Sequence, residues 1–111
     1  TALVCFDVIK ETAISKKLKS ELKDSNRTVI DISIDQMKNF LGNALEVRSK
    51  NNEKYLLMSE TAEDSLTVEQ KKQIQNRVNL LSFPIPTIEK YGGGSVRCML
   101  AEIFLDKSEL K

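Results

Sequence analysis

Apolar residues occur in short runs along the chain, and polar segments separate these runs. Leu3–Ile9 is a nearly continuous apolar run of strand length, which predicts a strand covered on both faces. Between Ile14 and Leu22 an apolar residue recurs at every fourth position, which predicts an amphipathic helix with Thr12 as its cap. Asp24–Asn26 ends this helix, and Val29–Ile32 predicts a second short strand.

The middle of the chain predicts a short helix followed by a hairpin. Asp35 is expected to cap a helix that runs through Phe40, and Gly42 suits the left-handed position that ends it. Ala44–Arg48 alternates as a half-exposed strand, and Lys54–Met58 is the return strand after a polar turn. These two strands are therefore expected to pair.

The remaining segments repeat the order of strand, helix and strand. Thr67–Gln70 has the capping-box pattern, and the apolar stripe between Ile74 and Leu81 indicates the helix that follows. Leu80–Ile85 predicts a strand at the edge or end of a sheet, because Pro84 and Pro86 limit its pairing. Leu100–Leu105 is expected to be the last strand. Residues 1–111 thus predict a single domain of the α/β or α+β class without an internal linker.

Composition limits the function classes without choosing one. The chain has 41% apolar and 30% charged residues and a formal net charge of +1, so it is globular and carries no overall field toward nucleic acid or acidic membranes. It contains no apolar run near the ~20 residues that span a bilayer. Its two cysteines have no metal-ligand spacing, so no metal or cofactor is expected, and a reducing, cytoplasmic setting is the default.

One segment is dense in chemical signals, namely Gly92–Cys98, which reads Gly-Gly-Gly-Ser-Val-Arg-Cys. Consecutive glycines permit unusual backbone dihedrals and close approach of a ligand. Arg97 directly precedes Cys98, and a neighbouring guanidinium favours the nucleophilic thiolate. Taken alone, these residues favour a flexible connector and a small core thiol over a nucleophile.

The order of these motifs resembles a known family. Gly92–Met99 resembles the C-terminal nucleophile loop of the penteins, which include arginine deiminases, dimethylargininases and amidinotransferases. The longer stretch from Val29 to Leu105 resembles the last part of a bacterial arginine deiminase-related group that includes citrulline hydrolases. The segments that carry this likeness are Asp31–Ser33, Phe40–Val47 and Phe83–Tyr91.

The resemblance implies a fold and a mechanism. The fold would be the last one to two ββαβ-type modules of a five-module α/β propeller, with a mixed sheet and helices outside. Cys98 would attack the central carbon of a guanidino or ureido amino acid and form a thiouronium-type intermediate, which water or an amine resolves. A histidine normally transfers the protons, and this chain has none. We therefore expect a C-terminal fragment, inactive alone, whose partners are the remaining modules of the same protein and whose histidine precedes Thr1.

Four further residues are candidates for substrate binding: Arg97, Ser95, Gly94 and Asn43. Arg97 would bind a substrate carboxylate, tune Cys98, or form only a surface ion pair. Asn43 and Ser95 each have a structural alternative as turn residues.

Cys5 is interpreted as a core residue. The rival functions are an amidinotransferase, a non-catalytic interaction module, and a redox protein with a disulfide between Cys5 and Cys98. The sequence leaves substrate identity and oligomeric state open.

Overall fold

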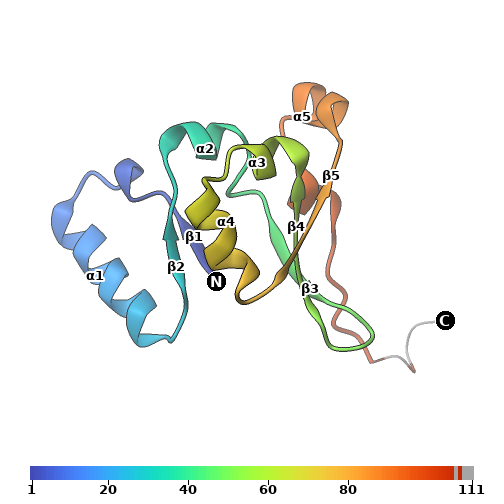
Figure 1. Cartoon of the computed structure of the whole chain (residues 1–111), viewed down its shortest axis with the longest axis horizontal. Coiled ribbons are helices and arrows are strands. Elements are labelled where there is room, and N and C mark those ends of the chain that lie inside the picture. The colour runs from blue at the N-terminus through green and yellow to red at the C-terminus, as the bar shows by residue number, and fades with distance from the viewer. Residues whose placement is uncertain (107, 109–111) are drawn as a thin grey trace.

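Two separate β-sheets organise the chain (Figure 1). The first is a parallel pair of β1 (Ala2–Val4) and β2 (Val29–Asp31). The second contains β3 (Leu45–Arg48), β4 (Lys54–Ser59) and β5 (Asn79–Phe83), with β4 in the centre. β4 pairs antiparallel with β3 and parallel with β5, so the sheet is mixed.

Helices connect and cover these strands. The computed structural model describes residues 1–106 and 108, and within them five α-helices and two 3₁₀-helices occur. The helices are α1 (Thr12–Asp24), α2 (Ile34–Lys38), α3 (Glu60–Asp64), α4 (Val68–Gln75), α5 (Pro86–Gly92), η1 (Phe6–Val8) and η2 (Val96–Met99).

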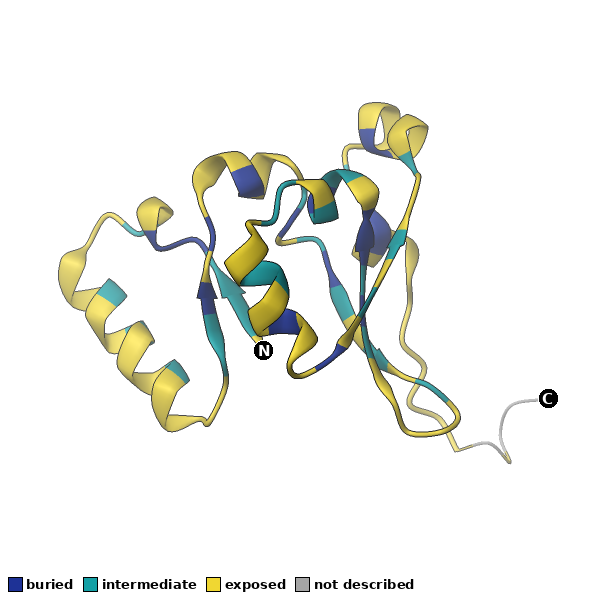
Figure 2. Cartoon of the chain, viewed as in Figure 1, coloured by how far each residue is buried: buried dark blue, intermediate teal, exposed yellow. Residues whose placement is uncertain are grey.

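The hydrophobic core joins the two sheets. Its buried residues lie in or directly after β1 and β2, in the segment before β3, in β4, in helices α3 and α4, and directly before β5: Cys5, Ile30, Ile32, Leu41, Ala44, Leu56, Met58, Ala62, Ile74 and Val78. Figure 1 shows α4 between the two sheets, where it contributes the fully buried Ile74. In Figure 2, α1 is exposed over most of its surface, and none of its residues is buried.

The predicted mixed α/β architecture is confirmed. The hairpin pairs as expected, with Val47 opposite Tyr55. Thr67 and Gln70 form the predicted capping box at the start of α4. β5 lies at a sheet edge. A helical connection joins the two strands of each parallel pair, because parallel strands cannot be linked by a tight turn.

Several predicted boundaries in the first half are wrong. The strand expected over Leu3–Ile9 ends at Val4 and turns into η1, because the partner strand β2 offers only three residues for pairing. Thr12 is the first residue of α1 and not its cap; Glu11 holds that position without a side-chain hydrogen bond. Ser33, not Asp35, caps α2, because Ser33 and Gln36 satisfy each other's backbone amides.

The prediction at Gly42 is also wrong. The left-handed residue after α2 is Phe40, with φ of 63°. Leu81 belongs to β5 and is exposed, so it is not part of the α4 stripe.

The predicted last strand, Leu100–Leu105, is absent. This segment follows η2 as irregular chain with all its large apolar side chains exposed, because no neighbouring strand pairs with it among the described residues. The helices α3 and α5 were not predicted. Pro86 begins α5, which is a normal use of proline at the first helical position.

Candidate active site

The three glycines shape the loop that presents Cys98. α5 ends at Gly92, and Gly93 adopts the left-handed conformation with φ of 67° that stops the helix. A Cβ atom on Gly94 would lie 2.9 Å from Cys98 Sγ, so only glycine lets the thiol pack against the backbone there. Ser95 is extended, and η2 follows with Cys98 exposed on it.

Asn43 holds this loop from the other side. Its Nδ2 donates a hydrogen bond to Cys98 Sγ at 3.0 Å, and its Oδ1 accepts one from the Arg97 backbone N–H at 3.0 Å. Asn43 lies just before β3, 55 residues away from Cys98 along the chain. One amide side chain thus fixes both the thiol and the backbone beside it.

This environment favours the thiolate of Cys98. The hydrogen bond from Asn43 lowers the pKa of the thiol below its ordinary value, and the backbone at Ser95 and the charge of Arg97 act in the same direction. The side chain is exposed and therefore open to a ligand. Exposure combined with a lowered pKa is the environment of reactive cysteines.

A buried polar cluster lies directly behind the loop. Ser95 is fully buried, and its hydroxyl donates to Glu89 Oε1 at 2.6 Å, while Thr61 donates to Glu89 Oε2 at 2.8 Å. Burial alone would raise the pKa of Glu89, but hydrogen bonds from Ser59, Ser95 and Thr61 outweigh it, so the pKa lies below its ordinary value. The Ser95 hydroxyl therefore faces the interior of the protein rather than a ligand.

Glu89 is a residue that sequence reasoning missed. In the sequence it is marked only by its place in the Phe83–Tyr91 segment that resembles the penteins. A helix that begins at Pro86 places Glu89 in its first turn, so recognising that helix would have drawn attention to the carboxylate.

Arg97 lines a cavity of about 330 Å³, which is also lined by Gly42, Ala44 and Glu46. Its side chain is in contact with the Ala44 carbonyl at 3.5 Å, and it forms no ion pair with an acidic residue in the described part of the chain. The guanidinium therefore remains available to an anionic group.

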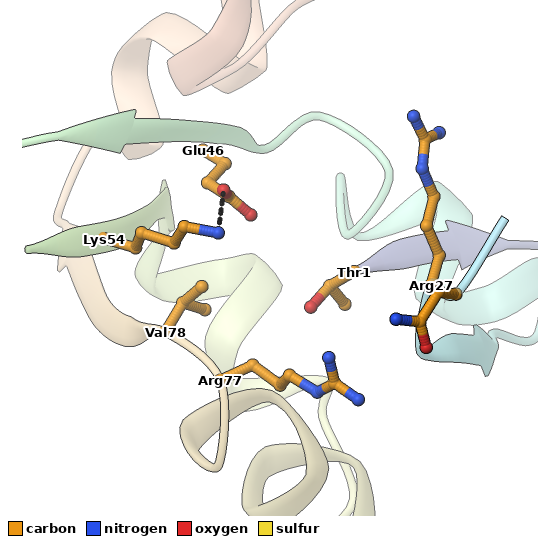
Figure 3. Close-up of a pocket in the computed structure, with 7 residues that line it drawn as sticks. Thr1, Arg27, Glu46, Lys54, Arg77 and Val78 are labelled. Atoms are coloured by element: carbon orange, nitrogen blue, oxygen red, sulfur yellow. Dashed lines mark ion pairs between the residues drawn. The ribbon is translucent and has the colours of Figure 1, made fainter.

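A second cavity, of about 390 Å³, opens between the two sheets (Figure 3). It is lined by Arg27 and Arg77 and by Glu46, which pairs with Lys54 at 3.7 Å. Thr1 and Glu46 line both cavities, so the two adjoin, although Cys98 lines neither.

Comparison with known proteins decides the family. The model of eukaryotic N,N-dimethylarginine dimethylhydrolases matches residues 1–105. The chain belongs to this dimethylarginine dimethylhydrolase family. The match confirms the resemblance to the penteins. No curated protein and no solved structure matches the chain.

The family match covers all five candidate residues, because Asn43, Gly94, Ser95, Arg97 and Cys98 lie between residues 1 and 105. The structure brings Asn43 into direct contact with Cys98 and Arg97, whereas it turns Ser95 away toward Glu89.

The other cysteine has a different environment. Cys5 is buried in the hydrophobic core, as predicted, and both cysteines are free. Within the described residues, no cluster of three or more histidine, cysteine or acidic side chains is arranged to hold a metal ion. No helix in that part of the chain has the length and apolar character needed to cross a membrane.

Proposed function

We propose that this chain carries the nucleophile of a hydrolase that acts on the guanidino carbon of methylated arginine, and that Cys98 is this nucleophile. The observation that carries the proposal is the hydrogen bond from Asn43 Nδ2 to an exposed Cys98 Sγ. Membership in the dimethylarginine dimethylhydrolase family supports the substrate class.

The chemistry follows from a stabilised thiolate. Cys98 Sγ forms a bond to the guanidino carbon, and the bond from that carbon to the methylated nitrogen breaks, so that the amine leaves with an added proton. Water then adds to the covalent thiouronium intermediate, the carbon–sulfur bond breaks, and a ureido product and the thiolate form. Asn43 keeps the sulfur oriented between these steps, and Arg97 is suited to the substrate carboxylate.

The chain lacks one part of this machinery. Protonation of the leaving amine and activation of water need an acid–base group, and none of the 111 residues is histidine. We infer that turnover requires a proton-transferring group from another part of the protein. The unit β3–β4–α3–α4–β5 has the ββαβ order expected of one propeller module, which supports this division of the site.

The family match favours hydrolysis over amidino transfer, because the matched family is named for a hydrolase. In an amidinotransferase the same thiol would attack the same carbon, and an amine would replace water in the second step. The redox alternative requires Cys5 to leave the core before it can reach a second thiol.

The thiol itself provides the test. We expect a haloacetamidine, which presents an amidinium beside a reactive carbon, to alkylate Cys98 faster than a model thiol, with a pH midpoint below the ~8.5 of a free cysteine. Asn43→Ala should raise this midpoint, because the largest contribution to the lowered pKa is removed. Asn39→Ala is the matched control, since the Asn39 side chain, at the end of α2, donates to the Asp35 carbonyl.

Two outcomes separate the parts of the proposal. Alkylation of Cys98 no faster than that of a model thiol at every pH would contradict the nucleophile. Release of dimethylamine from dimethylarginine by this chain alone would contradict the need for an outside proton-transferring group, while it would support the substrate class.

A further inference from the structure

Helix α5 buries a carboxylate and exposes its apolar residues. Glu89 is the only buried residue of α5, with 8% of its surface exposed, whereas Ile88 and Tyr91 are 39% and 77% exposed. Figure 2 shows the helix as exposed apart from one buried segment. Burying a carboxylate is unfavourable unless it is fully hydrogen-bonded. The orientation of α5 therefore depends on the partners that Glu89 finds inside.

These partners are three hydroxyl groups from two different parts of the fold. Ser59 is the last residue of β4 and caps α3 by accepting the Ala62 N–H at 3.1 Å, and Thr61 follows in α3. Ser95 comes from the nucleophile loop and makes the shortest of the contacts, at 2.6 Å. Both carboxylate oxygens are occupied, so Glu89 is not free to act on a substrate.

Ser95 connects this cluster to the thiol. Its carbonyl oxygen accepts the Cys98 N–H at 3.1 Å and closes the first turn of η2. The same turn brings Cys98 Sγ within 3.0 Å of Asn43 Nδ2. A shift of Ser95 would therefore move the thiol relative to its hydrogen-bond donor.

We propose that Glu89 is a positioning residue for Cys98, which it holds in register with Asn43 through the buried hydroxyl of Ser95. The inference rests on the proposed function, in which Cys98 is the nucleophile. Through the Ser59 hydroxyl, Glu89 also connects the loop to the end of β4, the central strand of the sheet.

The sign of one measurement distinguishes positioning from simple electrostatics. A negative charge near a thiolate disfavours it, so removing the charge of Glu89 would lower the pKa of Cys98 if charge alone mattered. Loss of positioning acts in the opposite direction, because a displaced thiol loses the hydrogen bond from Asn43 that lowers its pKa. The two effects therefore predict shifts of opposite sign in the pKa of Cys98.

The experiment measures the pH dependence of iodoacetamide alkylation at Cys98, followed by mass spectrometry of the peptide that contains it. Glu89→Gln keeps the shape of the side chain, and Ser95→Ala removes the connecting hydroxyl. Each variant should raise the pH midpoint and slow alkylation at pH 7 by about tenfold, as expected for the loss of a hydrogen bond to a charged group. The double variant should be no slower than either single variant, because both break the same connection.

Thr61→Val is the matched control, since it removes the hydrogen bond to Glu89 Oε2 without touching the nucleophile loop, while the Ser59 and Ser95 hydroxyls remain. It should leave the pH midpoint close to that of the wild type. Circular dichroism verifies that each variant is folded. If Glu89→Gln does not fold, the pH midpoint of Ser95→Ala is compared with that of Thr61→Val, and this comparison tests the inference.

Three results would overturn the inference: a midpoint that stays unchanged or falls in Glu89→Gln, a Ser95→Ala variant that behaves like the control, or additive losses in the double variant. An ordinary thiol midpoint in the wild-type protein would instead overturn the proposed function itself. The wild-type measurement therefore separates the two failures.

Discussion

The N-terminal region (residues 1–32) and the C-terminal region (residues 33–106) both contain a strand–helix–strand unit, but they differ in how far the connecting helices are buried. In the N-terminal region, α1 crosses between two parallel strands and buries none of its residues. In the C-terminal region, α3 and α4 cross between β4 and β5 and bury Ala62 and Ile74 completely. A helix buries a face only where enough sheet and neighbouring helix are present to cover it.

The same contrast separates the two cysteines. Cys5 follows β1 and packs in the shared core, whereas Cys98 lies on an exposed turn supported by Asn43. All the residues of the candidate active site come from the C-terminal region. The well-packed unit therefore supports the candidate active site, while the N-terminal region contributes one side of the core.

Two linked capping boxes of the C-terminal region connect to the N-terminal region through Gln70. The Gln36 amide of the α2 box donates to Gln70 Oε1 of the α4 box at 2.7 Å, and Gln70 Nε2 donates to the Asp31 carbonyl at 2.8 Å. β2 of the N-terminal region is thereby tied to α4 of the C-terminal region.

The largest expected difference is in the reactivity of the two thiols. Under native conditions Cys98 should be alkylated on the order of a thousandfold faster than Cys5, because a core thiol reacts only when its surroundings open. The ratio is measured by mass spectrometry of the two cysteine peptides after a short exposure to iodoacetamide. In 8 M urea the two rates should become similar. A comparable native rate at Cys5 would contradict its place in the core.

The next largest effect is on the free energy of unfolding, and it compares an isoleucine of α4 with an isoleucine of α1. Ile74→Ala in α4 should lower the free energy of unfolding by about 2–5 kcal/mol, because it leaves a cavity in a fully buried site. Ile14→Ala in α1 should change it by less than about 0.5 kcal/mol, since Ile14 is 53% exposed and alanine favours helix. Urea unfolding monitored by circular dichroism measures both. Equal losses would mean that α1 is covered in the protein in solution.

Local chemistry explains which elements could be predicted from the sequence. The Thr67–Gln70 capping box and the β3–β4 hairpin depend on residues close together in the chain, so their patterns are visible. The Ser33–Gln36 box has the same spacing, and this spacing favours Ser33 over Asp35 as the cap of α2. The strand predicted at Leu100–Leu105 has a suitable composition, but a strand also needs a partner, which no local pattern supplies.

The site was predictable only in part. The glycines and the Arg97–Cys98 pair mark the loop in the sequence. The contact from Asn43 joins residues 55 positions apart, so neither periodicity nor spacing reveals it. The burial of Glu89 could not be predicted for a different reason. Charged residues are usually exposed and apolar residues buried, and α5 has the opposite arrangement.

A smaller effect is expected on the alkylation rate of Cys98, and it distinguishes two glycines near the candidate active site. Gly94→Ala should slow alkylation of Cys98 at pH 7 by about tenfold, because the new methyl group displaces the sulfur from Asn43. Gly42→Ala adds its methyl group to open space next to Asn43 and should leave the rate unchanged. The alkylation assay above measures both variants. An unaffected Gly94→Ala would show that the thiol tolerates displacement and that its contact with Asn43 is not required.

The smallest effect compares two threonines at the starts of α4 and α1. Thr67 accepts a hydrogen bond from the Gln70 N–H, so Thr67→Ala should cost about 1 kcal/mol of stability. Thr12 is the first helical residue and caps nothing, so Thr12→Ala should be neutral or slightly stabilising. Thermal unfolding of the two variants measures the difference. If Thr12→Ala proved as costly as Thr67→Ala, the sequence-based assignment of Thr12 as a cap would be right, and α1 would contribute more to the stability of the N-terminal region than its exposed surface indicates.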